Sequence, residues 1–413
     1  MRYTFIIIIS TLLLSCKQQN SGLSEIQYKN IINDIEVLSA DDMEGRKVGT
    51  EGERKAAAYI SNRFKTMGLD TMDKNDGYYQ HFSVDKTDDP HMASSTMEDS
   101  VTSGINIVGY IDNQAEHTII LGAHYDHLGY GGFGSLHVGD PEVHNGADDN
   151  ASGVSMLICL ADMLSSGPQS NNYLFIAFSG EEMGLWGSNY WVKHANIELS
   201  DANYMINMDM VGRLNEENKL LVYGTGTSDI WQQTIDTNNV YQFQVIGSES
   251  GMGPSDHTSF YIEDIPVLSF FTGQHEDYHK PTDDAHLINY EGIKTITEYI
   301  YKIINDLDDN GKLNFIKTKD EEQTKMSFKV TLGVMPDYLH TDAGMRIDGV
   351  RPDRPADKAG IIKGDIVTKM GDLDISSMDD YMKALGAFEP GSTINITVIR
   401  DGKPVELSLT FDE

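Results

Sequence analysis

The chain has 413 residues, 39% of them hydrophobic, which allows two or three domains with a sizeable core and argues against wholesale disorder. Its 64 acidic side chains outnumber 31 Lys and Arg, and the formal net charge is −33. A surface this acidic repels nucleic acid and anionic membranes and attracts cations, including divalent metals, although it also serves solubility alone. Nucleic acid is therefore not an expected partner.

The N-terminus has the pattern of an export signal. Arg2 precedes an apolar run over 5–14 that is too short to span a bilayer, and the run ends in Leu13-Leu14-Ser15-Cys16. This ending resembles the lipobox of bacterial lipoproteins, in which the chain is cleaved before the cysteine and the sulfur is lipidated. We expect a signal peptide over 1–15, a lipidated Cys16 and a polar tether over 16–23. An ordinary signal peptide with an incidental cysteine is the alternative.

These features predict a location in the bacterial cell envelope, as a periplasmic or outer-membrane lipoprotein that touches the membrane only through its lipid anchor. The only other cysteine, Cys159, lies in an apolar segment with helical spacing and is expected to be buried. If Cys16 is lipidated, no disulfide can form.

Apolar runs of two kinds alternate along residues 24–307. Some are short and nearly continuous, as in strands buried on both faces, and others show the spacing of amphipathic helices. The expected strands are 105–111, 118–126, 173–179, 204–210 and 266–271, and the expected helices are 24–39, 51–68, 151–165, 185–195, 227–238 and 289–307. The alternation predicts an α/β domain with a mixed, mostly parallel central sheet and helices on both faces. A glycine-punctuated loop, "DDMEGRKVGTEG" (41–52), separates the first two helices.

Five polar clusters lie at or near the ends of these strands, where sites form in such sheets. They are His124 and Asp126 in "GAHYDHLG", Asp148 and Asp149 in "NGADDNASG", Glu181 and Glu182 in "SGEEMG", Asp209 in "NMDMVGR", and Tyr278 and His279 in "YHKPTDD". Imidazole and carboxylate groups together suit zinc or a similar first-row metal. They exceed the three protein ligands of one catalytic zinc, so they favour two metals that share a carboxylate.

The adjacent glutamates fit this interpretation. Two carboxylates at the end of a buried strand are costly unless positive charge lies nearby. Because successive residues point in different directions, one glutamate can bind a metal while its neighbour faces the substrate.

In this order the clusters resemble the co-catalytic di-zinc aminopeptidase family, which includes secreted bacterial leucyl-type aminopeptidases and glutamate carboxypeptidases. The resemblance covers about residues 24–307 and implies the zinc exopeptidase fold with two Zn²⁺ per chain. It implies one zinc held by His124 and Asp209, another held by Glu182 and His279, and a bridge between them from Asp149.

The same resemblance implies further roles. Glu181 would be the general base, Asp126 would orient His124, and Tyr278 would stabilise the oxyanion. The segment "PSDHTSF" would line the substrate pocket, which implicates Asp256 and His257. Five other histidines near these motifs are expected on the surface or behind the ligands: His127, His137, His144, His275 and His286. The glycine-rich stretch 129–146 is expected to rim the site.

The composition changes after Leu307. Residues 308–325 are charged and weakly apolar and are expected to be a linker, and short strand patterns resume over 326–413 with a hairpin turn at Asp401-Gly402. This C-terminal part resembles a small β-rich PDZ domain of bacterial envelope proteases. The resemblance implies that Leu332-Gly333-Val334 binds the C-terminal carboxylate of a peptide. A spacer that no longer binds peptide is the alternative.

The resemblance implies a metallo-aminopeptidase that hydrolyses N-terminal residues from peptides with a free N-terminus. Glu181 would deprotonate a water that bridges the two metals and acts as the nucleophile. A carboxypeptidase with the same ligands, a one-zinc glutaminyl-cyclase-like enzyme and a metal-stabilised PDZ binding protein are the alternatives. The full ligand set argues against the cyclase, and an unligated Glu181 argues against a binding protein.

Overall fold

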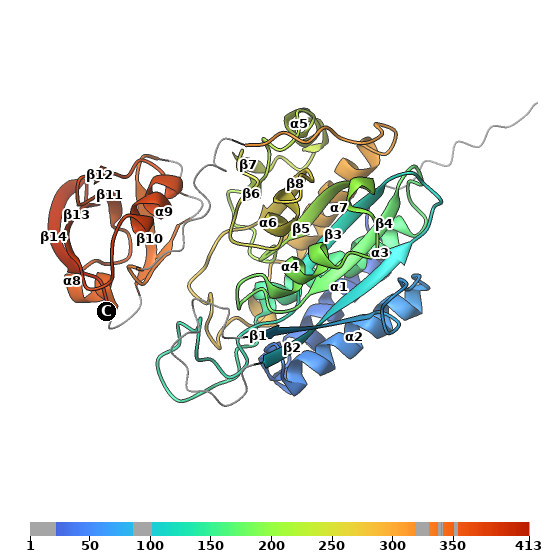
Figure 1. Ribbon diagram of the computed structural model, residues 1–413, viewed down its shortest axis with the longest axis horizontal. Helices are drawn as coiled ribbons and strands as arrows, with labels where there is room; N and C mark the ends of the chain where they lie inside the picture. The colour runs from blue at the N-terminus through green and yellow to red at the C-terminus, as the bar shows by residue number, and fades with distance from the viewer. Residues whose placement is uncertain are drawn as a thin grey trace, which may run out of the picture.

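The computed structural model describes residues 22–85, 101–318, 330–337, 340, 342–350 and 354–412. The predicted signal peptide, Cys16 and most of the tether lie outside these residues. Figure 1 shows two bodies, each built around its own sheet. Within the described ranges, no helix is long and apolar enough to cross a membrane.

The larger sheet has eight strands in the order β1-β2-β4-β3-β5-β8-β6-β7. The strands are β1 (Tyr79–Asp85), β2 (Val101–Ile111), β3 (Thr118–His124), β4 (Asn172–Phe178), β5 (Ala202–Met208), β6 (Lys219–Tyr223), β7 (Gln244–Ser248) and β8 (Val267–Phe271). The central strands β4, β3, β5 and β8 are parallel, and β1 and β2 extend the sheet antiparallel. At the other edge, β6 is antiparallel to β8 and parallel to β7. The mixed sheet with a parallel centre is the predicted one.

Helices cover both faces of this sheet. They are α1 (Glu25–Leu38), α2 (Glu51–Met67), α3 (Gly153–Leu164), α4 (Trp186–Lys193), α5 (Trp231–Asn238), α6 (His257–Tyr261) and α7 (Tyr290–Asp306). Along β3, Ile119 and Leu121 join the core beneath α1, α2, α3 and α7, whereas Ile120 joins the core with α4 and α6. Because side chains alternate between two buried faces, β3, β4 and β5 are buried along their whole length and most of their side chains are apolar.

Helix ends lie close to the predicted positions because the sequence encodes the caps. Ser24 and Gln27 form a capping box at the start of α1, and Gly68 ends α2 in the left-handed conformation. The structure contains elements that the expected ranges do not include, among them β6, β7 and α6. β7 is a partly exposed edge strand and α6 has five residues, so neither has a long apolar pattern.

The predicted linker needs a correction at its start. Residues 308–318 pack on the first domain: the Leu313 amide donates to Asn203 Oδ1, the Ile316 amide donates to the Thr227 carbonyl, and the Thr318 amide donates to the Tyr261 hydroxyl. Leu313 is buried. Sparse apolar residues suggested a solvated linker, but these few side chains and the backbone amides find partners on the sheet domain.

The second sheet contains β9 (Val334–Pro336), β10 (Met345–Val350), β11 (Ile366–Met370), β12 (Leu373–Asp374), β13 (Thr393–Arg400) and β14 (Lys403–Thr410), with helices α8 (Pro355–Ala359) and α9 (Met378–Gly386). All its strand pairs are antiparallel. The predicted hairpin joins β13 and β14, and Asp401 and Gly402 both have the positive φ that such a two-residue turn requires. The domain has its own apolar core.

Candidate metal and catalytic site

The predicted polar residues meet at the carboxyl edge of the parallel strands. His124 is the last residue of β3, the two glutamates follow β4, Asp209 follows β5, and His279 lies in the loop after β8. Asp149 lies in the turn η3 (Ala147–Ser152), which leads directly into α3. Four of these segments directly flank a buried strand or helix, whereas His279 is carried by a longer loop.

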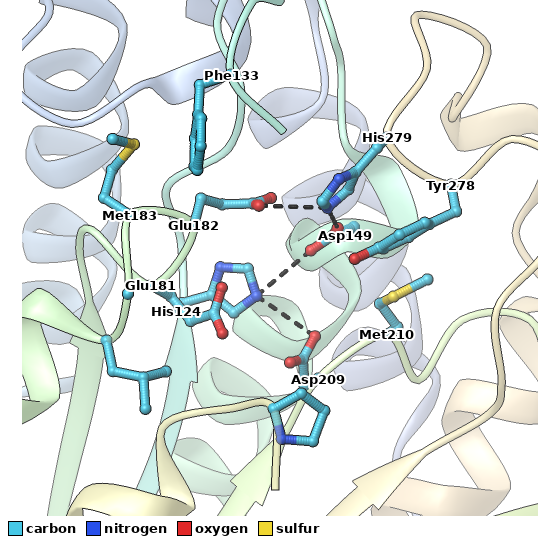
Figure 2. A pocket seen from close by; sticks show the side chains of 13 residues that line it. His124, Phe133, Asp149, Glu181, Glu182, Met183, Asp209, Met210, Tyr278 and His279 are labelled. Carbon is cyan, nitrogen blue, oxygen red and sulfur yellow. Dashed lines mark hydrogen bonds and ion pairs between the residues drawn. The ribbon is translucent and has the colours of Figure 1, made fainter. Parts of the chain in front are cut away.

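The carboxylate of Asp149 lies between two histidines. Its Oδ1 is 3.3 Å from His124 Nε2, and its Oδ2 is 3.2 Å from His279 Nε2. His124 Nε2 is also 3.3 Å from Asp209 Oδ1, and His279 Nε2 is 3.2 Å from Glu182 Oε2. Figure 2 shows the resulting chain of contacts, which runs from Glu182 through His279, Asp149 and His124 to Asp209. One half of the cluster is His124 with Asp209, and the other half is His279 with Glu182. Asp149 points one carboxylate oxygen toward each half.

His127 adds a contact that the sequence did not predict. Its Nδ1 lies 2.7 Å from Glu182 Oε1 and 3.8 Å from Asp149 Oδ2, and the residue is only 1% exposed. Glu182 is therefore held between two imidazoles, one on each oxygen. His127 was expected either on the surface or behind the ligands. It is buried, and it lies behind the ligands in direct contact with the proposed ligand Glu182.

This donor set fits metal ions. Ligand atoms of His124, Asp149 and Asp209 lie within 4.8 Å of one another, and so do those of His127, Asp149 and Glu182. Asp149 belongs to both groups. Imidazole nitrogens and carboxylate oxygens are the usual ligands of zinc, and buried carboxylates at this density need positive charge.

The imidazole rings are held in the orientation that metal binding requires. His279 Nδ1 lies 2.8 Å from the Gly134 carbonyl, and His124 Nδ1 lies 3.2 Å from the Asp126 carbonyl. A carbonyl only accepts, so each Nδ1 carries a hydrogen, and each Nε2 faces the cluster, where a metal ion would take its lone pair. Asp126 thus supports His124 mainly through its backbone, since its Oδ1 is 3.7 Å from His124 Nδ1 and accepts a hydrogen bond from the Glu181 amide.

The two adjacent glutamates have opposite electrostatic environments. Burial and the carboxylates of Asp209 and Glu182 raise the pKa of Glu181 well above its usual value. Burial also opposes ionisation of Glu182, but His279 and His127 lower the pKa of that carboxyl to about 2. Glu182 is therefore a permanent anion suited to a cation, and Glu181 has the higher proton affinity that proton transfer uses.

The histidines respond in the complementary direction. Burial alone would lower the pKa of His279, but Glu182 and Asp149 raise it to about 10. Burial likewise opposes protonation of His124, yet Asp209 and Glu181 raise its pKa well above the usual value. The carboxylates thus stabilise positive charge in the cluster, and a metal dication would supply such a charge.

A cavity of about 390 Å³ opens over the cluster. The proposed ligands, Glu181, Tyr278, Phe133, Met183, Leu185, Met210 and Pro254 line it. Figure 2 shows the Tyr278 hydroxyl pointing toward the cluster, and the Tyr278 ring stacks on His279 with 3.8 Å between centroids. Tyr278 therefore lies beside the cluster, and its role in stabilising an oxyanion stays a prediction.

Asp256 and His257 lie beside this cavity. His257 lines a smaller adjoining cavity of about 70 Å³, and burial lowers the pKa of its ring to about 3, so the ring is neutral. Asp256 is buried, and burial raises its pKa to about 7. Among the described residues, no hydrogen bond reaches either ring nitrogen of His257.

The remaining predicted residues have other positions. His144 is buried and contacts the Ser135 hydroxyl, His275 lies 3.2 Å from Asp148, and the side chain of His286 is 73% exposed. In the second domain, Leu332 is buried and the Gly333 amide donates to the Thr331 hydroxyl. The role of residues 332–334 in peptide binding stays a prediction, as does the lipidation of Cys16.

Comparison with known proteins agrees with this geometry. Residues 106–304 match peptidase family M28, and residues 316–411 match the PDZ domain. The chain is 32% identical over 173 residues to the aminopeptidase YwaD of Bacillus subtilis, an alignment that covers 38% of each protein. The chain thus spans well under half of that relative.

Solved structures share the fold at low sequence identity. The zinc aminopeptidase BSAP of Bacillus subtilis matches with a TM-score of 0.52 at 19% identity, over 70% of this chain and 95% of BSAP. The glutaminyl cyclase of Porphyromonas gingivalis matches with a TM-score of 0.53 at 16% identity, over 68% and 98%. These likenesses establish the fold alone. The reaction has to be inferred from the residues of the site. The sequence match thus assigns residues 106–304 a likeness to peptidase family M28, and a segment that matches the PDZ domain follows them in the same chain.

Proposed function

We propose that this protein is a zinc-dependent aminopeptidase with two Zn²⁺ per chain. The observation that carries the proposal is the position of Asp149, whose two oxygens contact His124 and His279 in different halves of the cluster. One half adds Asp209, and the other adds Glu182 with His127 as its neighbour. When bound, the ions would polarise the scissile carbonyl and increase the acidity of water.

The protein's own residues supply the proton transfers. Glu181 lies in the cavity beside His124 and, unlike Glu182, it is not held by a histidine in the contacts described above (Figure 2). It accepts the proton of the attacking water and returns it to the leaving amine. The Tyr278 hydroxyl faces the same space and donates to the carbonyl oxygen as negative charge develops there.

The cavity favours a free N-terminus over a free C-terminus. Four carboxylates line it, from Asp149, Glu181, Glu182 and Asp209, and none of the described lining residues is Lys or Arg. A carboxypeptidase needs a cationic or other donor group for the terminal carboxylate of its substrate. An α-ammonium group needs no cation, so the lack of Lys and Arg in the described lining favours the aminopeptidase, although only the carboxylate of Glu181 is not a proposed metal ligand.

The test uses matched substrates. A panel of aminoacyl reporter amides should be cleaved, and cleavage should stop with chelator and return with zinc. N-acetylated forms of the same amides should not be cleaved, because acetylation removes the ammonium charge. Cleavage of N-acetylated peptides from their C-terminus would establish a carboxypeptidase, and cyclisation of N-terminal glutamine without hydrolysis would establish a cyclase.

We also propose that Cys16 is lipidated and anchors the protein in a bacterial cell envelope. The support is the sequence Leu13-Leu14-Ser15-Cys16 after a short apolar run. Cys16→Ser should release the protein from the membrane fraction without changing its rate on small amides. Retention of Cys16→Ser in the membrane fraction would contradict the anchor.

A further inference from the structure

We propose that residues 41–53 form a clamp that sets the spacing of three loops carrying the proposed metal ligands, with Arg46 and Glu53 as its positioning residues. The inference concerns the metal site of the proposed function and therefore rests on it. The clamp precedes residues 106–304, so the match to family M28 does not account for it.

Arg46 joins two ligand-bearing segments through backbone carbonyls. Its Nε donates to the Tyr125 carbonyl at 2.7 Å, and Tyr125 lies between His124 and Asp126. Nη1 and Nη2 donate to the carbonyls of Asn145 and Gly146 at 2.7 and 2.9 Å, just before the turn that holds Asp149. A single planar guanidinium thus fixes the end of β3 relative to the start of η3.

The position of Arg46 is unusual for a side chain that only supports the fold. The residue is 1% exposed, and none of the ion pairs found among the described residues involves it. Burial lowers its pKa to about 10, while the charges of Asp149 and Asp126 act to raise it. A buried guanidinium held only by carbonyls is costly, and the nearby acidic cluster offsets that cost.

Glu53 extends the clamp to the third segment. Its Oε1 accepts a hydrogen bond from the Ser179 hydroxyl at 2.5 Å and another from the Ile105 amide at 3.0 Å. Its Oε2 accepts from the Gly49 amide at 2.7 Å, within the clamp itself. Ser179 stands two residues before Glu181. Glu53 therefore ties the loop of the paired glutamates to the same segment that Arg46 ties to β3 and η3.

Close backbone packing keeps this segment in place. The Gly45 carbonyl accepts a hydrogen bond from the Gly129 amide at 2.9 Å. Gly45 has a φ of 63°, and a Cβ at this position would lie 2.5 Å from the Gly129 carbonyl oxygen and 2.7 Å from that of His144. Only glycine allows this approach, which joins the clamp to the rim of the site.

The experiment measures zinc affinity and needs no turnover. Zinc would be titrated into the metal-free protein against a chromophoric competitor, at a temperature where circular dichroism shows each variant folded. Arg46→Lys keeps the charge but loses the fork that joins the two ligand-bearing segments, and Glu53→Gln keeps the shape but cannot accept at both oxygens. We expect each variant to bind zinc about 10- to 100-fold more weakly, as for other residues that support metal ligands.

Two nearby residues supply matched controls. Arg54 and Glu51 lie on the same helix and pair with each other at 2.9 Å, and their side chains are 53% and 59% exposed. Arg54→Lys and Glu51→Gln should leave zinc affinity unchanged. If Arg46→Lys and Glu53→Gln unfold less cooperatively but still bind zinc as tightly as the controls, the two residues only support the fold and the inference is wrong.

Arg46→Met separates positioning from charge. If the positive charge of Arg46 mainly repels the metals, its removal will tighten zinc binding, which would also overturn the inference. A wild-type protein that binds zinc but cleaves no aminoacyl amide would refute the proposed function and leave the clamp testable by the same titrations.

Discussion

At the scale of single residues, the proposed function requires different roles for two adjacent glutamates: Glu181 transfers protons and Glu182 binds metal. Glu181→Gln should retain zinc, because in the structure this side chain lies beside the cluster and the histidine contacts belong to Glu182. The amide cannot accept a proton, so kcat should fall by about 10²- to 10⁴-fold. Metal analysis and steady-state kinetics on aminoacyl amides check both statements.

The neighbouring residue provides the control for that experiment. Glu182→Gln should lose zinc as well as activity, because a neutral amide replaces the anion that lies between His127 and His279. If Glu181→Gln loses zinc and Glu182→Gln retains it, the two roles are reversed.

His127 is expected to support Glu182 rather than to act in the reaction. Its Nδ1 donates to Glu182 Oε1 and leaves the other oxygen facing His279. His127→Ala should weaken zinc binding by roughly 10- to 100-fold, and His127→Asn, which keeps a donor near the same place, should recover part of the loss. The exposed His286 supplies the control, since His286→Ala should bind zinc normally. Equal affinities in all three variants would remove His127 from the site.

The sequence located the proposed ligands more completely than the residues that contact them. His124, Asp149, Glu182, Asp209 and His279 follow strands or begin a helix, so strand patterns alone bring them to one edge of the sheet. His127 lies in an irregular loop, and no periodicity predicts which way a loop residue points. Its position three residues after His124 in "HYDH" was the only available signal.

At the scale of elements, the glycine-rich stretch 129–146 behaves as a wall of the site, as predicted. The Gly134 carbonyl accepts from His279 Nδ1, and the Leu136 amide donates to the His279 carbonyl at 2.9 Å. The stretch also presents exposed apolar side chains, among them Tyr130 at 54% and Phe133 at 53%. Of these two, Phe133 lines the cavity.

Phe133 is therefore expected to contact the substrate. Phe133→Ala should raise KM for peptides by about tenfold, because a partly buried aromatic contact contributes roughly 1–2 kcal/mol, and kcat should change little. Tyr130→Ala is the matched control, since Tyr130 is equally exposed and lies outside the cavity lining. A larger effect on KM from Tyr130→Ala than from Phe133→Ala would mean that peptides follow another path into the site.

Strands that are completely buried were predicted from the sequence, whereas a partly exposed strand at the edge of the sheet was not. β3, β4 and β5 are buried along their whole length, so their apolar runs are unambiguous. β7 has two exposed and three half-buried residues, a pattern that also suits a loop. The clamp over residues 41–53 was predicted only as a loop (41–52) and the start of a helix (51–68), because its order comes from long-range contacts such as that between Glu53 and Ser179.

At the scale of the whole molecule, the contacts of residues 308–318 show where the catalytic domain can be cut. A chain that ends at residue 318 should keep the zinc content, melting temperature and small-amide activity of the full protein, because every proposed ligand lies before residue 280. A chain that ends at residue 307 loses Leu313 and the bond from Thr318 to Tyr261.

The shorter chain should be less stable by on the order of 2–4 kcal/mol, from one or two buried apolar side chains and their backbone hydrogen bonds. Thermal unfolding of the two chains in parallel checks this difference. Equal melting temperatures would show that residues 308–318 are a linker after all.

The chain that ends at residue 318 also tests what the PDZ domain adds. If the domain holds the free carboxylate of a peptide while the peptide's N-terminus occupies the zinc site, peptides of intermediate length will be cleaved fastest by the full protein. That preference should disappear on truncation, and it should also disappear on C-terminal amidation, which removes the carboxylate. A length series of free and amidated peptides on both chains provides the measurement. Equal rates throughout would mean that the PDZ domain is a spacer or binds another protein, because neither role depends on the length of the substrate.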